Sequence, residues 1–134
     1  MLLKPDGGEL YVISAAANGL QVVNTWTHEM GDYVLLGSTP VRGILSPESG
    51  LLYVCDAVAD RITPVLINNR RVLRPIQVGQ QPMALRFTPG GRLLLVLNQG
   101  SDDLSVVGMR TGAGSLLTMI PVGHQPRELV VQLF

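Results

Sequence analysis

The feature that most constrains this chain is a phrase that returns every 42 residues. It begins at Pro5, Pro47 and Pro89, spaced 47 − 5 = 42 and 89 − 47 = 42, and leads through a turn into an apolar segment. The apolar segments read LYVIS, LYVCD and LLVLN. A second set of landmarks keeps the interval once, and its third copy comes two residues late: Gly37 and Pro40, Gly79 and Pro82, Gly123 and Pro126. A fixed period of this length indicates a repeat architecture, in which each unit buries its apolar face against a neighbour.

Each repeat reads as four short strands. The first is apolar and ends at the proline turn, as in VRGIL at residues 41–45. The second is a nearly continuous apolar run, LLYVCD at residues 51–56, which suits a strand covered on both faces. Tyr53, Val54 and Cys55 are therefore expected to be buried between neighbouring units.

The punctuation of the repeat supports this division into strands. Prolines at positions 75 and 121 place the fourth strand at an edge, where a missing N–H is tolerated. Pro64 predicts a bulge, or a position facing away from the ladder, in the third strand of the second copy. Asn and Asp tolerate positive φ, so a hairpin turn follows the second strand in every copy, at Asn18, Asp60 and Asp102.

These patterns predict an all-β chain. We expect a β-propeller segment of about three four-stranded antiparallel blades with a 42-residue repeat, and no substantial helix, because no segment keeps a helical apolar period. Residues 1–134 form a single partial propeller in this interpretation. Its repeats cover about 1–42, 43–84 and 85–128, with an insertion at 110–114 and an orphan first strand of a next blade at 126–134.

The repeated motif resembles the YVTN β-propeller repeat. The resemblance lies in LYVIS, LYVCD and LLVLN and in the closing motifs IQVGQQP and IPVGHQP. Leu95 in place of the tyrosine is a departure from that pattern, as is the lack of an Asp after the third strand. The resemblance implies a binding or interaction module and suggests a periplasmic, secreted or cell-surface location, although no signal peptide is visible in the chain.

Three repeats are too few for a closed ring, since propellers usually close with about 4–8 blades. The end blades would expose bare faces and unpaired strand edges. Three explanations stay open: a fragment of a longer propeller, a chain that completes its ring by self-association, or an open half-propeller. We predict that the chain is not a stable monomer.

Composition narrows the possible functions. Ten acidic and ten basic residues cancel, which gives no electrostatic footprint for nucleic acid. No apolar run is long enough for a membrane span. The single cysteine, Cys55, is expected to be a buried small hydrophobe, and His28 and His124 lack neighbours at metal-ligand spacing. We therefore predict no catalytic residues, no metal and no cofactor.

Polar side chains gather in the loops that join one blade to the next. Such loops surround the mouth of a propeller's central channel, together with the ends of the second strands. A polar ring there could hold an acidic or polar ligand, such as a protein or a glycan. The predicted binding residues are Arg42, Asp56, Gln81, Asn98, His124, Arg127 and Glu128.

Three functions remain at this point. The first is a non-catalytic binding, interaction or structural module, completed by a second copy or by missing blades of a longer chain. The second is a fragment of a propeller enzyme, similar to lactonases or to quinone or haem oxidoreductases, whose active site is incomplete in this chain. The third is a non-functional remnant of a longer gene.

Overall fold

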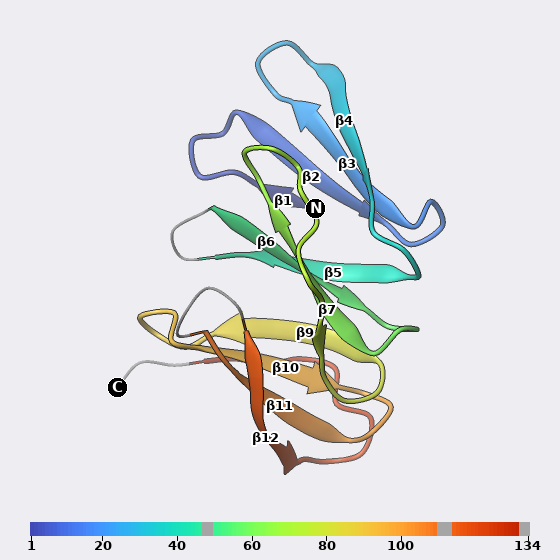
Figure 1. Ribbon diagram of the computed structural model, residues 1–134, viewed down its shortest axis with the longest axis vertical. Coiled ribbons are helices and arrows are strands. Elements are labelled where there is room, and N and C mark those ends of the chain that lie inside the picture. The colour runs from blue at the N-terminus through green and yellow to red at the C-terminus, as the bar shows by residue number, and fades with distance from the viewer. Residues whose placement is uncertain (47–49, 110–113, 132–134) are drawn as a thin grey trace.

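The computed structural model describes residues 1–46, 50–109 and 114–131. Every regular element in this part of the chain is a strand (Figure 1). The strands are β1 (Leu2–Leu3), β2 (Glu9–Ser14), β3 (Gly19–Asn24), β4 (Glu29–Leu35), β5 (Pro40–Leu45), β6 (Leu51–Asp56), β7 (Arg61–Leu66), β8 (Ile76–Gln77), β9 (Pro82–Phe87), β10 (Leu93–Asn98), β11 (Asp103–Gly108) and β12 (Ser115–Pro121).

The strands form three four-stranded sheets stacked along the long axis of the molecule (Figure 1). Each sheet is an antiparallel meander in chain order, β1 to β4, β5 to β8 and β9 to β12. We call them blades 1, 2 and 3. The predicted all-β class and the predicted division into three four-stranded blades are both confirmed.

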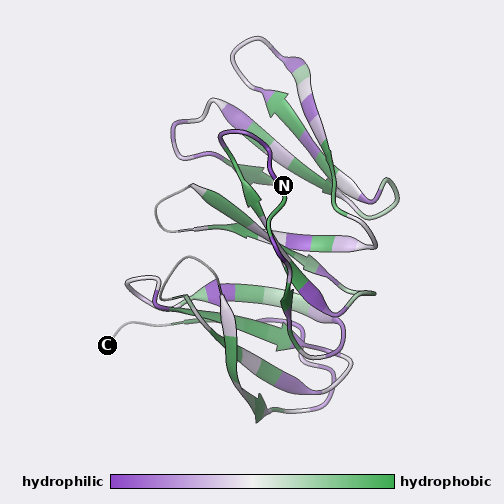
Figure 2. Ribbon diagram, in the orientation of Figure 1, coloured by the Kyte–Doolittle hydropathy of each residue, from purple (hydrophilic) through white to green (hydrophobic). Residues whose placement is uncertain are grey.

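Apolar side chains fill the two seams between the blades, and the strands are correspondingly apolar (Figure 2). Strand β6 serves both seams, because successive side chains of a strand point to opposite faces. Leu52 and Val54 pack against blade 1, whereas Tyr53 and Cys55 pack against blade 3. Burial also raises the pKa of the Cys55 thiol, so it stays protonated at neutral pH, as expected for a small hydrophobe.

The fourth strand of each blade lies at an edge, as the prolines indicate. Pro121 ends β12, and Pro75 directly precedes β8, which has only two residues. Pro64 lies opposite Tyr53 in β7, and β8 pairs only with Arg61 and Ile62 at the start of that strand. The proline therefore costs the ladder no hydrogen bond to the fourth strand.

The same turn joins the second and third strands of every blade. Asn18, Asp60 and Asp102 adopt positive φ values of 55°, 57° and 53°. Their carbonyls accept bonds from the residues that follow the fourth strands: Leu36 N at 2.9 Å, Val78 N at 3.2 Å and Val122 N at 2.9 Å. This repeated backbone bond, which we call the turn latch, fixes the point where the chain leaves each blade.

Residues 126–131 form no strand, although a first strand of a next blade was expected over 126–134. A blade's first strand is held by the second, as β9 is by β10. No second strand follows within the described part of the chain, so nothing pairs with this segment. Residues 132–134 lie outside the described residues, as do residues 110–113 of the expected insertion.

No helix that could cross a membrane occurs among the described residues.

The seam between blades 1 and 2 predicts a large effect for one truncation. Leu52→Ala removes a fully buried side chain from that seam, and such truncations cost about 2–5 kcal/mol. Val58→Ala is the matched control, because Val58 is exposed and should change stability by less than about 0.5 kcal/mol. Urea unfolding followed by far-UV circular dichroism measures both. Equal midpoints for the two variants would contradict the assigned seam.

Candidate functional site

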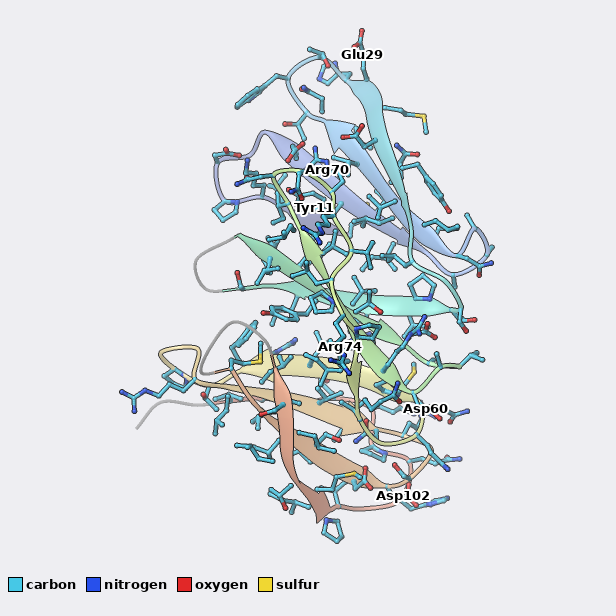
Figure 3. All side chains as sticks on the ribbon, viewed as in Figure 1. Tyr11, Glu29, Asp60, Arg70, Arg74 and Asp102 are labelled. Carbon is cyan, nitrogen blue, oxygen red and sulfur yellow. The ribbon has the colours of Figure 1, made fainter. Side chains whose placement is uncertain are left out.

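The predicted site lies on one side of the stack, which we call the crossover face. It carries the turns at 15–18, 57–60 and 99–102 and the loops at 36–39, 78–81 and 122–125 that lead out of the three blades. These segments lie on the right in Figure 1, and Figure 3 shows Asp60 and Asp102 there. We call the opposite side the hairpin face, because it carries the turns at 4–8, 25–28 and 67–75 within blades.

Acidic turn residues hold the crossover loops in place. Asp60 Oδ1 accepts the Gln81 N–H at 3.0 Å, and Asp102 Oδ1 accepts the Gln125 N–H at 2.8 Å. His124 Nδ1 lies 3.1 Å from Asp102 Oδ2. The bond from Gln125 and then the His124 ring lower the pKa of Asp102, which keeps this carboxylate ionised. Gln81 and Gln125 both have positive φ, so the two loops share one conformation.

Asp56 is buried, with 3% of its surface exposed, and does not reach the solvent as predicted. Its Oδ1 accepts three backbone N–H groups, from Thr39 at 3.1 Å, Val58 at 3.2 Å and Ala59 at 3.0 Å. Burial raises the pKa of Asp56, but these three donors and Arg61 outweigh it, so the net shift is downward. Asp56 thus holds the crossover loop from blade 1 onto blade 2.

The ionised Asp56 is only partly compensated. Its Oδ2 lies 3.6 Å from Arg61 Nε, which is an ion-pair distance but beyond hydrogen-bond range. Both atoms are buried without a hydrogen-bond partner in the described structure. Most of the stabilisation of this carboxylate therefore comes from the three backbone donors.

Asn98 has the equivalent position in blade 3 and is fully buried. Its Nδ2 donates to Asp103 Oδ1 and to Ser105 Oγ, both at 2.8 Å. Ser105 Oγ in turn accepts the Gly79 N–H at 3.2 Å. A Cβ at position 79 would lie 2.6 Å from Asn98 Nδ2, so the close approach requires glycine. Asn98 too is a structural residue beneath the loop.

The other predicted residues are exposed, but the structure does not gather them at one point. Gln81 lines a cavity of about 430 Å³ with Ala57, Val58, Asp60, Gln80 and Gly100. Arg42 lines a different cavity, between β1, β2 and β5. His124 is 82% exposed, and Arg127 and Glu128 follow it outside any strand.

Metal chemistry finds no support among the described residues. No group of three or more His, Cys, Asp or Glu side chains that could hold an ion occurs in them. The crossover face offers amides, a few charges and loop N–H groups, which can bind a polar ligand but contain no nucleophile paired with a base.

A charged cluster on the hairpin face was missed by the sequence reasoning. Glu9 on β2 accepts bonds from both Nη atoms of Arg70, which follows β7, and from the Tyr11 hydroxyl at 2.9 Å. Arg70 Nε also donates to Asp32 Oδ2 at 2.9 Å. Lys4 Nζ lies 4.0 Å from Glu9 Oε1. The cluster joins blade 1 to the loop of blade 2.

The electrostatics of this cluster follow from its geometry. The bonds from Arg70 are the main cause of the lowered pKa of Glu9. Burial, and then the bond to Glu9, raise the pKa of Tyr11, while Glu9 and Asp32 raise that of Arg70. A sequence signal existed, because Glu9 stands where the other two repeats have Leu51 and Leu93.

Comparison with known proteins identifies the fold. No family model matches the chain, and neither does any curated protein sequence. Among solved structures, hydrazine synthase of Kuenenia stuttgartiensis is similar over 93% of this chain and 36% of that one, with a TM-score of 0.85 and 24% identity. A periplasmic gluconolactonase of Pseudomonas aeruginosa is similar over 95% and 40%, with a TM-score of 0.81 and 21% identity.

A protein of unknown function from Desulfotomaculum acetoxidans gives the same result, with a TM-score of 0.79, 16% identity and coverage of 93% and 42%. At these identities the likeness shows the fold alone. This chain spans about two fifths of the length of those structures. The chain therefore has a β-propeller fold of three blades.

Asp56 gives a prediction about the crossover loop. Asp56→Ala leaves three N–H groups without their acceptor and should lower the free energy of unfolding by about 1–3 kcal/mol. Asp56→Asn keeps an acceptor oxygen and should lose less. Chemical denaturation of the two variants measures the difference. Equal losses would mean that the charge, and not the acceptor geometry, holds the loop.

Glu9 predicts a pH dependence. Because its pKa in the folded state is lowered from 4.5, the cluster stabilises the protein fully above that value and loses the effect as pH falls through the folded pKa. Glu9→Gln should therefore cost about 1–2 kcal/mol near neutral pH and progressively less below pH 4.5. Thermal unfolding of both proteins along a pH series tests this. A difference that does not change with pH would contradict it.

Proposed function

We propose that this chain is a non-catalytic interaction or structural propeller module, whose two end faces are covered by further blades of the same kind. For the chain as it stands, the proposed occupant of those faces is a second copy. The observation that carries the proposal is the match between the bare end faces and the packed seams.

The outer face of blade 1 is apolar and uncovered. Val22 and Val34 face blade 2, so their neighbours Val23 and Leu35 point away from it, as does Met30, which pairs with Val23. Met30 and Leu35 are largely exposed, with 67% of Leu35 accessible. Further apolar side chains share this face through the register: Leu3, Leu10 and Val12.

The outer face of blade 3 is apolar as well. Leu94 and Val107 face blade 2, so Leu95 and Val106, which pair with each other, point away from it. Leu104 and Ile120 form the next pair on the same face, and Ile120 is about half exposed. Isolated exposed apolar residues are common on proteins, but rows of paired ones across a whole sheet face indicate an interface.

The repeat makes the two end faces complementary. Leu95 and Leu104 occupy the positions that Tyr53 and Ile62 fill on the face of blade 2 that packs against blade 3, 42 residues earlier. Leu10 and Val23 correspond in the same way to Leu52 and Val65, which pack against blade 1. Blade 3 of one copy can therefore meet blade 1 of another through a contact of the kind already present at both seams.

This association is head-to-tail, and it closes if the rotation allows. Two copies supply 2 × 3 = 6 blades, within the usual range of about 4–8. Ring closure would also bring the crossover loops of both copies around one channel. The exposed residues Arg42, Gln81, His124, Arg127 and Glu128 are then the proposed contacts for a polar ligand, either a protein or a glycan.

The oligomeric state tests the proposal. Leu35→Glu places a charge on the outer face of blade 1 and should shift the chain toward monomer in sedimentation velocity. Val58→Glu is the matched control, because Val58 is equally exposed, at 67%, but lies in a turn of the crossover face. It should leave the association unchanged.

Complementation distinguishes head-to-tail association from other modes. Ile120→Glu damages only the outer face of blade 3, and Leu35→Glu only that of blade 1. Neither variant alone retains an undamaged interface, but a mixture of the two has one. We expect a heterodimer in the mixture only. A wild-type chain that is a folded, concentration-independent monomer would overturn the proposal.

A second candidate function is part of a propeller enzyme. It rests on the likeness in fold to the gluconolactonase, and it would need catalytic groups from blades that this chain does not contain. Hydrolysis of gluconolactone, measured by proton release against a buffer blank, is the direct assay. Turnover by the purified chain would favour this candidate over the module.

A further inference from the structure

The hairpin face carries a cavity that the proposed function does not use. Its volume is about 300 Å³, at the small end of the range for small-molecule sites. It lies at the seam of blades 1 and 2, beside the cluster formed by Glu9 and Arg70. The lining residues are Lys4, Asp6, Gly8, Glu9, Asn24, Trp26, Ile67, Asn68 and Arg70.

We infer that this cavity is a binding site for a neutral saccharide, with Trp26 as its stacking platform. Trp26 is the single tryptophan of the chain, and 72% of its surface is exposed. Large aromatic side chains are usually buried, so an indole left at the rim of a polar cavity calls for a partner. A sugar ring offers a matching C–H face to such a surface and hydroxyl groups at its edge.

The platform is held in place by its own loop. Asn24 Oδ1 accepts the backbone N–H groups of Trp26 at 2.9 Å and of Thr27 at 3.1 Å. The Thr25 N–H donates to the Gly8 carbonyl at 3.1 Å, which fastens this turn to the neighbouring one. A Cβ at position 8 would lie 3.0 Å from the indole ring, so glycine lets the ring rest against the backbone. Little ordering of the platform is then required on binding.

The charges around the cavity favour a neutral ligand. Lys4 and Arg70 are cationic, Asp6 and Glu9 are anionic, and the four cancel. Arg70 and Glu9 are already paired with each other, which leaves the ammonium of Lys4, the carboxylate of Asp6 and the amide of Asn68 at the opening. These groups alternate donors and acceptors, as the hydroxyls of a sugar require. A strongly anionic or cationic ligand would meet an opposing charge in either case.

The cavity also departs from the repeat, whereas the packing positions follow it. Glu9 replaces the leucine found at positions 51 and 93, and Trp26 stands where the next repeat has Asn68. The site therefore belongs to this one seam. It lies away from both outer faces, so the inference does not rest on ring closure.

Tryptophan fluorescence gives a direct test, because Trp26 supplies the whole signal. The probes are methyl β-glucoside, cellotriose and chitotriose, with choline chloride and glucose 6-phosphate as charged comparators. We expect a saturable change with at least one neutral saccharide and with neither charged probe. The same titration on Leu35→Glu should give the same affinity, which separates this inference from self-association.

Variants measured by isothermal titration calorimetry complete the test. Trp26→Ala should weaken binding at least about tenfold, since a truncated tryptophan anchor costs about 2 kcal/mol or more. Trp26→Phe, which keeps a flat ring, should lose less, and Val58→Ala should bind as the wild type does. The inference is overturned if no neutral saccharide binds, if choline or the phosphate binds in their place, or if Trp26→Ala retains full affinity while folded by circular dichroism.

Discussion

Face-to-face packing of the blades is the constraint on which the rest of the structure depends. No blade has enough apolar surface within itself to form a core, so both clusters of buried side chains lie between blades. Blade 2 is covered on both sides, and that is why β6 is buried along almost its whole length. The blades at the ends keep one bare face each, and the quaternary arrangement we propose follows from this imbalance.

Polar residues near the seams secure connections that packing leaves loose. Asp56 and Asn98 lie at the same position of consecutive repeats, and each holds an incoming crossover loop, one by accepting backbone N–H groups and the other through Ser105. Glu9 and Arg70 do the equivalent work on the opposite face, but at one seam only. Repeated polar residues thus support the architecture, and unrepeated ones mark places where a ligand is plausible on physical grounds.

The fold could be predicted from the sequence because its determinants are periodic. Pro47, the apolar run after it and the turn at Asp60 return at a fixed interval, and each has a local physical meaning. The site was harder to predict. Asp56 and Asn98 were placed on the correct face, but their side chains turn inward, since whether a polar side chain binds a loop or faces solvent depends on the loop's path. The partnership of Glu9 with Arg70, 61 residues apart, depends on how two blades stack, and no local pattern encodes that.

The turn latch has a consequence for how the molecule assembles. It joins Asn18 to Leu36, Asp60 to Val78 and Asp102 to Val122, separations of 36 − 18 = 18, 78 − 60 = 18 and 122 − 102 = 20 residues. Contacts this close in sequence cost little loop-closure entropy, so each blade can form without waiting for distant parts of the chain. Folding can then begin at any blade and spread to its neighbours, and damage to one blade stays local until it reaches a seam.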